Sequence, residues 1–107
     1  MSDSIQNARR LWKEQRYAGS VKMYHQLLLL DPENIDILTD MIQIYSEIKQ
    51  IDFCFQMAQR LEIVDADNIL AKYYQARCLF VRNQLFHSRR KLMEILNTNP
   101  KHKGSLI

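Results

Sequence analysis

The chain of 107 residues is long enough for one modest domain, and its 47% hydrophobic and 25% charged residues indicate a globular rather than a disordered protein. Two glycines and two prolines are too few for the turns of an all-β protein, and no apolar run approaches the roughly 20 residues that cross a bilayer. The net charge of +3 hides a basic–acidic–basic pattern, which favours a charge-complementary protein partner over a nucleic-acid track.

Apolar residues at helical spacing predict six helices, in chain order over residues 3–14, 18–30, 35–47, 52–64, 69–82 and 86–97. The segments between them repeat. Asp-Pro-Glu-Asn at 31–34 recurs 34 residues later as Asp-Ala-Asp-Asn at 65–68, and Asn-Pro-Lys-His at 99–102 is a third copy. Each copy reads as a helix stop, and Asn34 and Asn68 are placed to cap the helix that follows.

Further positions match when the chain is divided into three blocks of 34 residues, 1–34, 35–68 and 69–102. A small residue recurs in the second helix of each block, at Ser20, Cys54 and Ser88, and an aliphatic residue follows seven positions later, at Leu27, Leu61 and Ile95. Small residues where two helices cross, with large ones filling the gaps, allow close antiparallel packing. We therefore predict one domain of three helix–turn–helix repeats, with residues 103–107 as a short tail or the start of a capping helix.

These columns resemble those of the tetratricopeptide repeat family over residues 1–102. The family's small, aromatic and proline positions are matched at Ala8, Ser20, Tyr24, Pro32 and Ala76. The chain departs from the family pattern at Gln15, Leu27, Ile42, Lys49, Ala66 and Asn83. The resemblance implies a divergent member with an all-α, right-handed superhelical stack of three repeats.

No motif for catalysis, cofactor binding or metal binding is found in the sequence. The three histidines are scattered, two glycines cannot form a phosphate loop, and no nucleophile lies beside a base in a recognisable motif. Cys54 is interpreted as a small packing residue, with Cys78 similar. We therefore expect no enzyme, cofactor or metal. The absence of a secretory signal and the two unpaired cysteines favour a reducing, cytoplasmic compartment.

The resemblance also implies that the first helix of each repeat lines a concave groove that holds a partner segment. The groove residues are then Ile5, Arg9, Trp12, Lys13, Thr39, Asp40, Gln43, Ser46, Tyr73, Tyr74, Arg77 and Phe80. Aromatic residues and arginine dominate binding hot spots, so an apolar or amphipathic protein or peptide segment is the expected partner. The alternative is that Trp12 or Phe80 packs against a neighbouring helix and that Tyr74 lies between repeats.

One subset of the family grips a C-terminal carboxylate with five basic and amide side chains. Those positions correspond here to Ile5, Arg9, Asp40, Leu70 and Tyr74. Only one of them is basic and Asp40 would repel a carboxylate, so a chaperone-binding clamp of this type is not expected.

A basic surface is expected near the end of the chain, at Arg82, Arg89, Arg90 and Lys91. It is interpreted first as a solvated face and second as a contact for an acidic partner. Nucleic acid comes third, because no aromatic residues interleave with the charges for stacking on single strands.

Three functions remain open from the sequence. The first is a non-catalytic adaptor that binds a partner segment in its groove and serves the assembly of a larger complex. The second is a small chaperone for a subunit of a secretion or pilus machine. The third is a regulatory subunit or fragment of an enzyme or transport complex. The last repeat has no polar covering helix, so its apolar face is expected to meet a partner or a second copy, unless the sequence is part of a longer chain.

Overall fold

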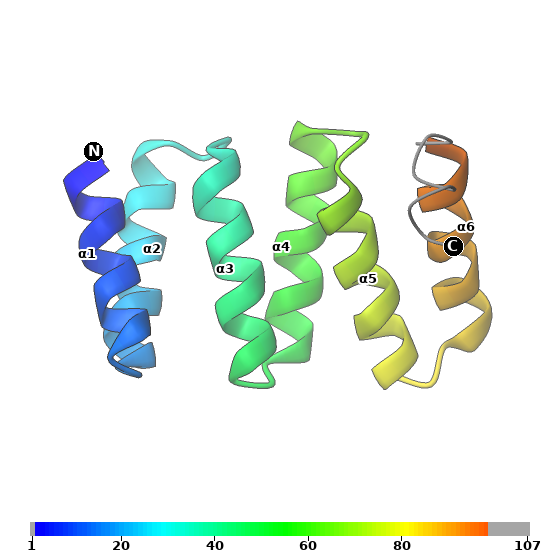
Figure 1. Cartoon of the computed structure of the whole chain (residues 1–107), viewed down its shortest axis with the longest axis horizontal. Helices are drawn as coiled ribbons and strands as arrows, with labels where there is room; N and C mark the ends of the chain where they lie inside the picture. Colours follow the sequence, from blue (N-terminus) through cyan, green and yellow to red (C-terminus); the bar gives the residue numbers. More distant parts are fainter. Residues whose placement is uncertain (1, 99–107) are drawn as a thin grey trace.

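The computed structural model describes residues 2–98 of the chain, and the side chains of residues 4–97. Six helices follow one another, α1 (Ser2–Lys13), α2 (Tyr17–Leu30), α3 (Ile35–Glu47), α4 (Ile51–Val64), α5 (Ile69–Val81) and α6 (Leu85–Thr98). They stand side by side as three helical hairpins (Figure 1). All six predicted helices are present with bounds within one residue of the prediction, so the predicted helical repeat stack is confirmed. The third stop signal at 99–102 and the tail at 103–107 lie outside the described residues.

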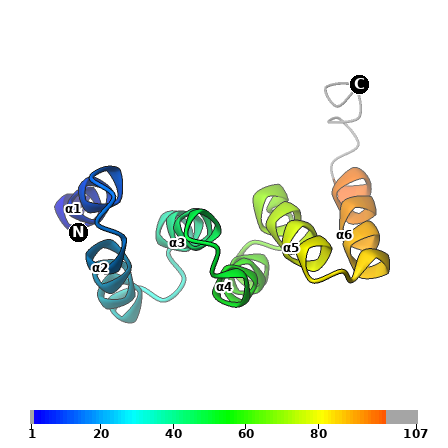
Figure 2. The same ribbon diagram turned by 90° about the horizontal axis from the view of Figure 1, so that it is seen from below.

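The first five helices form two rows, and α6 stands at the end of the stack beside α5 (Figure 2). Seen along the helices, α1, α3 and α5 lie along one side of the stack, and α2 and α4 lie along the other (Figure 2). The core runs between the rows, and its most completely buried large side chains are Tyr24, Ile37, Leu38, Met41, Ile42, Ile44 and Leu61. Within the described residues, no helix is both long enough and apolar enough to cross a membrane.

The small residues that recur at one position of the repeat connect the two helices of each hairpin. The Ser20 hydroxyl donates to the carbonyl of Ala8 at 2.8 Å, and the Ser88 hydroxyl donates to that of Ala76 at the same distance. The Cys54 thiol makes the equivalent contact with the carbonyl of Ile42 at 3.5 Å. Each donor is buried and follows its acceptor by twelve residues. A small polar side chain therefore lets the helices approach while its own hydrogen-bonding group stays satisfied.

The turn inside each hairpin has the same backbone conformation although no glycine is present. Gln15, Lys49 and Asn83 adopt φ values of 62°, 60° and 62°, the left-handed region. The amide of the next residue donates to the carbonyl five positions back in all three turns, and the amide of the turn residue donates three positions back. These paired bonds are the Schellman motif, which satisfies the free carbonyls at a helix end and normally uses glycine at this position.

The turn between hairpins uses an asparagine cap, as predicted. The side chain of Asn34 accepts from the amide of Ile37 at 3.0 Å, and that of Asn68 accepts from the amide of Ala71 at 2.9 Å. Both asparagines also donate to the aspartate three residues earlier, Asp31 and Asp65. The repeated stop signal therefore acts as a local cap that starts α3 and α5 in the same way.

Candidate partner-binding face

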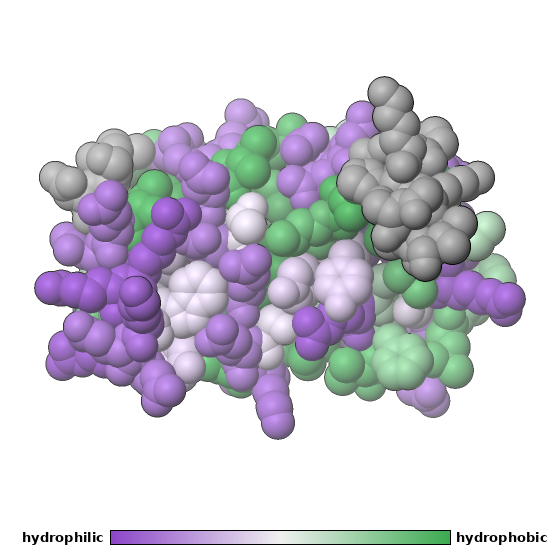
Figure 3. All heavy atoms as spheres, in the orientation of Figure 1, coloured by the Kyte–Doolittle hydropathy of each residue, from purple (hydrophilic) through white to green (hydrophobic). Residues whose placement is uncertain are grey.

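The twelve predicted groove residues all come from α1, α3 and α5, the helices of one row. We call the surface made by these helices the front face; it is the face seen in Figure 3, where polar residues dominate over α1 and apolar residues gather over the lower part of α5. The residues predicted for this face differ in what they contact, and the differences decide which of them are open to a partner.

Asp40 is an interior residue of the front face rather than an open groove residue. Its side chain belongs to a residue only 6% exposed, and its carboxylate accepts hydrogen bonds from Arg9 Nε and from the Tyr24 hydroxyl, both at 2.7 Å. The bond to Asp40 raises the pKa of Arg9, and burial together with the same carboxylate raises the pKa of Tyr24. Asp40 therefore joins α1, α2 and α3, and it has no free carboxylate edge to repel a ligand.

The seam between α1 and α3 contains a first hollow. Its volume is about 540 Å³ and it is lined by Arg9, Trp12, Lys13, Gln15, Tyr17 and Glu47. Trp12 is half-buried, and its indole N–H donates to the Glu47 carboxylate at 2.8 Å. This hollow is lined mainly by charged and polar groups.

One repeat further along, the seam between α3 and α5 contains a second hollow of about 300 Å³. It is lined by Ser46, Lys49, Ile51, Cys54, Tyr74, Arg77, Cys78 and Val81. Ser46, Lys49 and Ile51 stand 34 residues after Trp12, Gln15 and Tyr17 of the first hollow, and Val81 stands 34 after Glu47. The two hollows are therefore repeat equivalents, and the second has the more apolar lining.

Two free, buried cysteines form part of the wall of the second hollow. The neighbouring Cys78 and burial raise the pKa of the Cys54 thiol, which keeps it protonated. Cys54 is thus a small packing residue, in line with its predicted role.

Arg77 and Lys49 are the two exposed cations that line the second hollow, and Arg77 lies beside two aromatic rings. Its guanidinium lies 5.4 Å from the ring centroid of Tyr74 and 6.0 Å from that of Tyr73, within the range of a cation–π contact. Among the described residues it has no carboxylate partner. Its charge is therefore held in place by aromatic rings and remains available to an acidic group of a partner.

The other predicted groove residues divide into two groups. Ile5 and Tyr74 pack against the core, and Thr39, Gln43 and Ser46 are half-buried. Tyr73 and Phe80 are exposed and turn to a third hollow beside α6, described below. The predicted groove omitted three lining residues of the first hollow, Gln15, Tyr17 and Glu47, and five of the second, Lys49, Ile51, Cys54, Cys78 and Val81. The 34-residue repeat relates Gln15 to Lys49 and Tyr17 to Ile51, but no residue type marks these turn positions as groove lining.

The basic surface predicted on the last repeat is made of two kinds of residue. Arg82 forms an ion pair with Asp52 and lies over the ring of Phe55, and Lys91 pairs with Glu62 at 3.0 Å. Arg89 and Arg90 are exposed, with no ion pair within the described part of the chain. Of the four residues predicted for the basic surface, Arg89 and Arg90 are therefore the two that are free to contact an acidic group.

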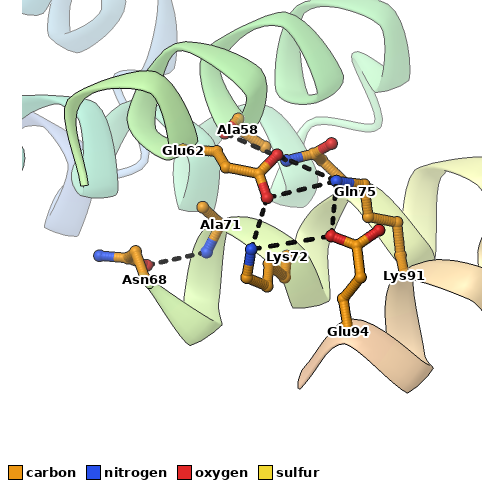
Figure 4. A network of polar contacts seen from close by, with 8 residues as sticks. All are labelled: Ala58, Glu62, Asn68, Ala71, Lys72, Gln75, Lys91 and Glu94. Carbon is orange, nitrogen blue, oxygen red and sulfur yellow. Dashed lines mark hydrogen bonds and ion pairs between the residues drawn. The ribbon is translucent and has the colours of Figure 1, made fainter. Parts of the chain in front are cut away.

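Glu62 of α4 is the centre of a polar network that holds the last hairpin (Figure 4). Its carboxylate accepts from Lys72 at 2.7 Å, from Gln75 at 2.9 Å and from Lys91 at 3.0 Å. Burial is the largest single influence and favours the neutral acid, but the three hydrogen bonds together outweigh it and lower the pKa of Glu62 to about 2. The network fastens α5 and α6 to α4.

Within residues 4–97, no three His, Cys, Asp or Glu side chains are grouped closely enough to hold a metal ion. Every buried side-chain nitrogen or oxygen in this range has a hydrogen-bond partner. The features of the front face include hollows, aromatic rings and the exposed Arg77, which suit the binding of a partner segment.

No protein-family profile and no curated protein matches the chain. Among solved structures, the Yersinia enterocolitica type III secretion chaperone SycD in complex with a peptide of the translocator YopD matches with a TM-score of 0.84 and 15% identity, over 96% of this chain and 81% of that one. The first TPR of Spaghetti, bound to an HSP90 peptide, matches with a TM-score of 0.80 and 14% identity, over 91% and 77% of the two chains. A chain of the CopN–Scc3 complex reaches 0.84 at 11% identity, over 91% and 57%. The chain therefore has the fold of a tetratricopeptide-repeat domain, as its sequence pattern predicts.

Proposed function

We propose that the protein is a non-catalytic binding module that holds a segment of a partner protein across the front face and so serves the assembly of a larger complex. The observation that carries the proposal is the second hollow, which combines an apolar wall with the exposed Arg77. A partner residue with an apolar side chain fits a cavity of about 300 Å³, and an adjacent acidic residue would pair with the guanidinium. Two free thiols in the wall suit a reducing compartment such as the cytoplasm.

The first hollow extends this contact by one repeat. Lys13 is exposed there and Trp12 offers a half-buried ring, so a partner segment lying across both seams meets a polar site and then an apolar one. The structural relatives that hold an HSP90 peptide support peptide binding on this fold. At the positions of the family's carboxylate clamp, however, Asp40 is already paired and Leu70 packs against the core. We therefore propose that the partner is held by the hollows rather than by a terminal-carboxylate clamp.

The experiment compares partner capture by matched variants of the full chain. Arg77→Glu combined with Trp12→Ala should abolish binding of the captured partner and leave the far-ultraviolet circular dichroism unchanged. Val81→Glu, which places a charge in the apolar wall of the second hollow, should weaken binding by itself. Lys22→Glu makes a comparable charge change at an exposed site on α2 and should have no effect. Unchanged affinity in the folded double variant would refute the role of the front face.

A second candidate function is a small chaperone for one apolar subunit of a secretion machine. The observation in its favour is the likeness to SycD bound to a peptide of the translocator YopD, which extends over nearly the whole of this chain. A chaperone of this kind should co-purify with one small partner in a fixed ratio. An adaptor should capture several proteins, and intact mass spectrometry of the purified complex separates the two outcomes.

A further inference from the structure

The end of the stack beside α6 is lined by apolar side chains that the described residues leave uncovered. Tyr73, Phe80 and Leu92 are 45%, 65% and 46% exposed. They surround a third hollow of about 220 Å³, whose floor contains the buried residues Ala76 and Ser88. We call this surface, formed by these five residues together with Arg77 and Val81, the end seam.

The end seam is the repeat equivalent of two surfaces that the chain covers with its own helices. Leu92 stands 34 residues after Ala58 and 68 after Tyr24, and both of those residues are fully buried. In the first hairpin, α3 covers this position through Asp40, whose carboxylate accepts from the Tyr24 hydroxyl. In the second, α5 covers it through Gln75, whose amide lies 3.5 Å from the carbonyl of Ala58. The position that is buried in the first two hairpins is therefore part of an exposed apolar surface in the third.

The two covering helices show what chemistry this kind of seam accepts. In α3 the residues Ile37, Met41 and Ile44 are fully buried, and their equivalents Ala71, Gln75 and Cys78 in α5 are also buried. Both helices therefore offer small or aliphatic side chains, with one amide, at positions i, i+4 and i+7, which lie on one face of a helix. A third helix with this pattern has the shape to fit the end seam.

The charges around the end seam indicate which kind of helix would bind to it. Residues 69–98 contain six basic residues and one acidic residue. Arg77 lines the end seam, and Arg89 and Arg90 lie exposed on α6. A two-fold contact with a second copy would bring these like charges together, which is unfavourable, whereas an acidic segment is attracted.

We infer that the end seam is a second docking surface, which adjoins the second hollow through Arg77 and Val81 and is distinct from the first hollow. It takes an acidic, amphipathic helix of a partner protein, with small or aliphatic residues at i, i+4 and i+7. The partner helix continues the stack as α3 and α5 do within the chain.

The test uses the full chain and a peptide probe taken from its own sequence. Residues 34–48 contain Ile37, Met41 and Ile44 together with three acidic residues. The fluorescein-labelled peptide should bind saturably in an anisotropy titration at low salt and more weakly at high salt. Leu92→Glu should weaken this binding at least about tenfold, because it buries an unpaired charge of the same sign as the peptide. A peptide of the same composition in scrambled order should not bind.

Controls separate binding at this surface from binding at the first hollow of the front face. Lys22→Glu on α2, and Trp12→Ala combined with Lys13→Glu in the first hollow, should leave probe binding unchanged. If circular dichroism shows that Leu92→Glu unfolds, Phe80→Glu serves in its place, since Phe80 is the most exposed residue of the seam. Peptide binding that survives both charge variants overturns the inference. So does sedimentation equilibrium that shows the chain pairing with itself through Leu92, since the occupant would then be a second copy.

Discussion

The Asp40 carboxylate accepts a hydrogen bond of 2.7 Å from the Tyr24 hydroxyl, and both residues are buried where α3 packs on the first hairpin. Arg9 of α1 pairs with the same carboxylate, so one acidic side chain connects three helices. An aspartate on the front face thus has a structural role, because a buried carboxylate is tolerated only where charge-assisted bonds replace its water.

Substitutions at this pair should have unequal effects on stability. Tyr24→Phe should lower the free energy of unfolding by about 1 kcal/mol, since one hydrogen bond is lost while Arg9 still pairs with Asp40. Asp40→Ala should lower it by roughly 2–4 kcal/mol, because the Tyr24 hydroxyl is then buried without an acceptor. Asp36→Ala, at an exposed position in the first turn of α3, should lower it by only about 0.3–1 kcal/mol, through the helix dipole. Urea denaturation followed by circular dichroism measures all three, and equal losses from the first two variants would contradict this role.

Glycine at the turns inside the hairpins should stabilise the protein. The φ values of Gln15 and Lys49 are positive, which costs an L-residue about 1 kcal/mol that glycine avoids. Gln15→Gly and Lys49→Gly should each raise the free energy of unfolding by about 0.5–1 kcal/mol. Asn83→Gly should raise it less, because asparagine tolerates this region better.

The matched control for these variants is Gln26→Gly, which places glycine inside helix α2 at an exposed position. It should lower the free energy of unfolding by roughly 0.5–1 kcal/mol. A loss of stability on replacing Lys49 would show that its side chain contributes more than its backbone conformation costs. The readout is the midpoint of thermal unfolding.

Stability should fall as the pH is lowered through the range set by Glu62. The folded state lowers the pKa of Glu62 from its ordinary value of 4.5 to about 2, so folding favours the ionised carboxylate. Its contribution is complete above about pH 4.5 and is lost as the pH falls towards 2, because the unfolded chain binds the proton first. Urea denaturation midpoints measured between pH 6 and pH 2 give the size of the effect. A shift of one pKa unit between the unfolded and folded states corresponds to about 1.4 kcal/mol.

The corresponding variant is Glu62→Gln, which should remove part of this pH dependence and should be less stable than the parent at neutral pH. Glu33→Gln, at an exposed site with no ion pair among the described residues, should leave the pH profile unchanged. A parent profile that is flat from pH 5 to pH 2 would refute the network's contribution.

A fragment ending at residue 68 should be largely unfolded. Removing α5 uncovers Ala58 and Leu61, both fully buried in the whole chain, and removes every partner of Glu62. Stacked hairpins depend on their neighbours for burial, so the two remaining repeats should lack a cooperative thermal transition by circular dichroism. A sharp melt from this fragment would show that the first two hairpins are stable without the third.

Much of the fold could be predicted because it depends on local chemistry that repeats every 34 residues. The Asn34 and Asn68 caps and the column of Ser20, Cys54 and Ser88 are visible as spacings, and each acts on backbone groups close by in the chain. The left-handed turns could not be deduced in the same way, because Gln15, Lys49 and Asn83 share no residue type that demands such a conformation.

The sequence by itself thus determined the helices, their pairing and the repeat, since periodicity and capping are properties of short segments. Only the tertiary structure decided which polar residues of the front face are exposed and which are enclosed. Asp40 and Arg77 were both predicted for the groove, yet the first is enclosed by Tyr24 and Arg9 and the second is exposed beside an apolar hollow. The physical reason is that burial and charge pairing depend on residues 16 to 31 positions away, which meet only when the hairpins stack.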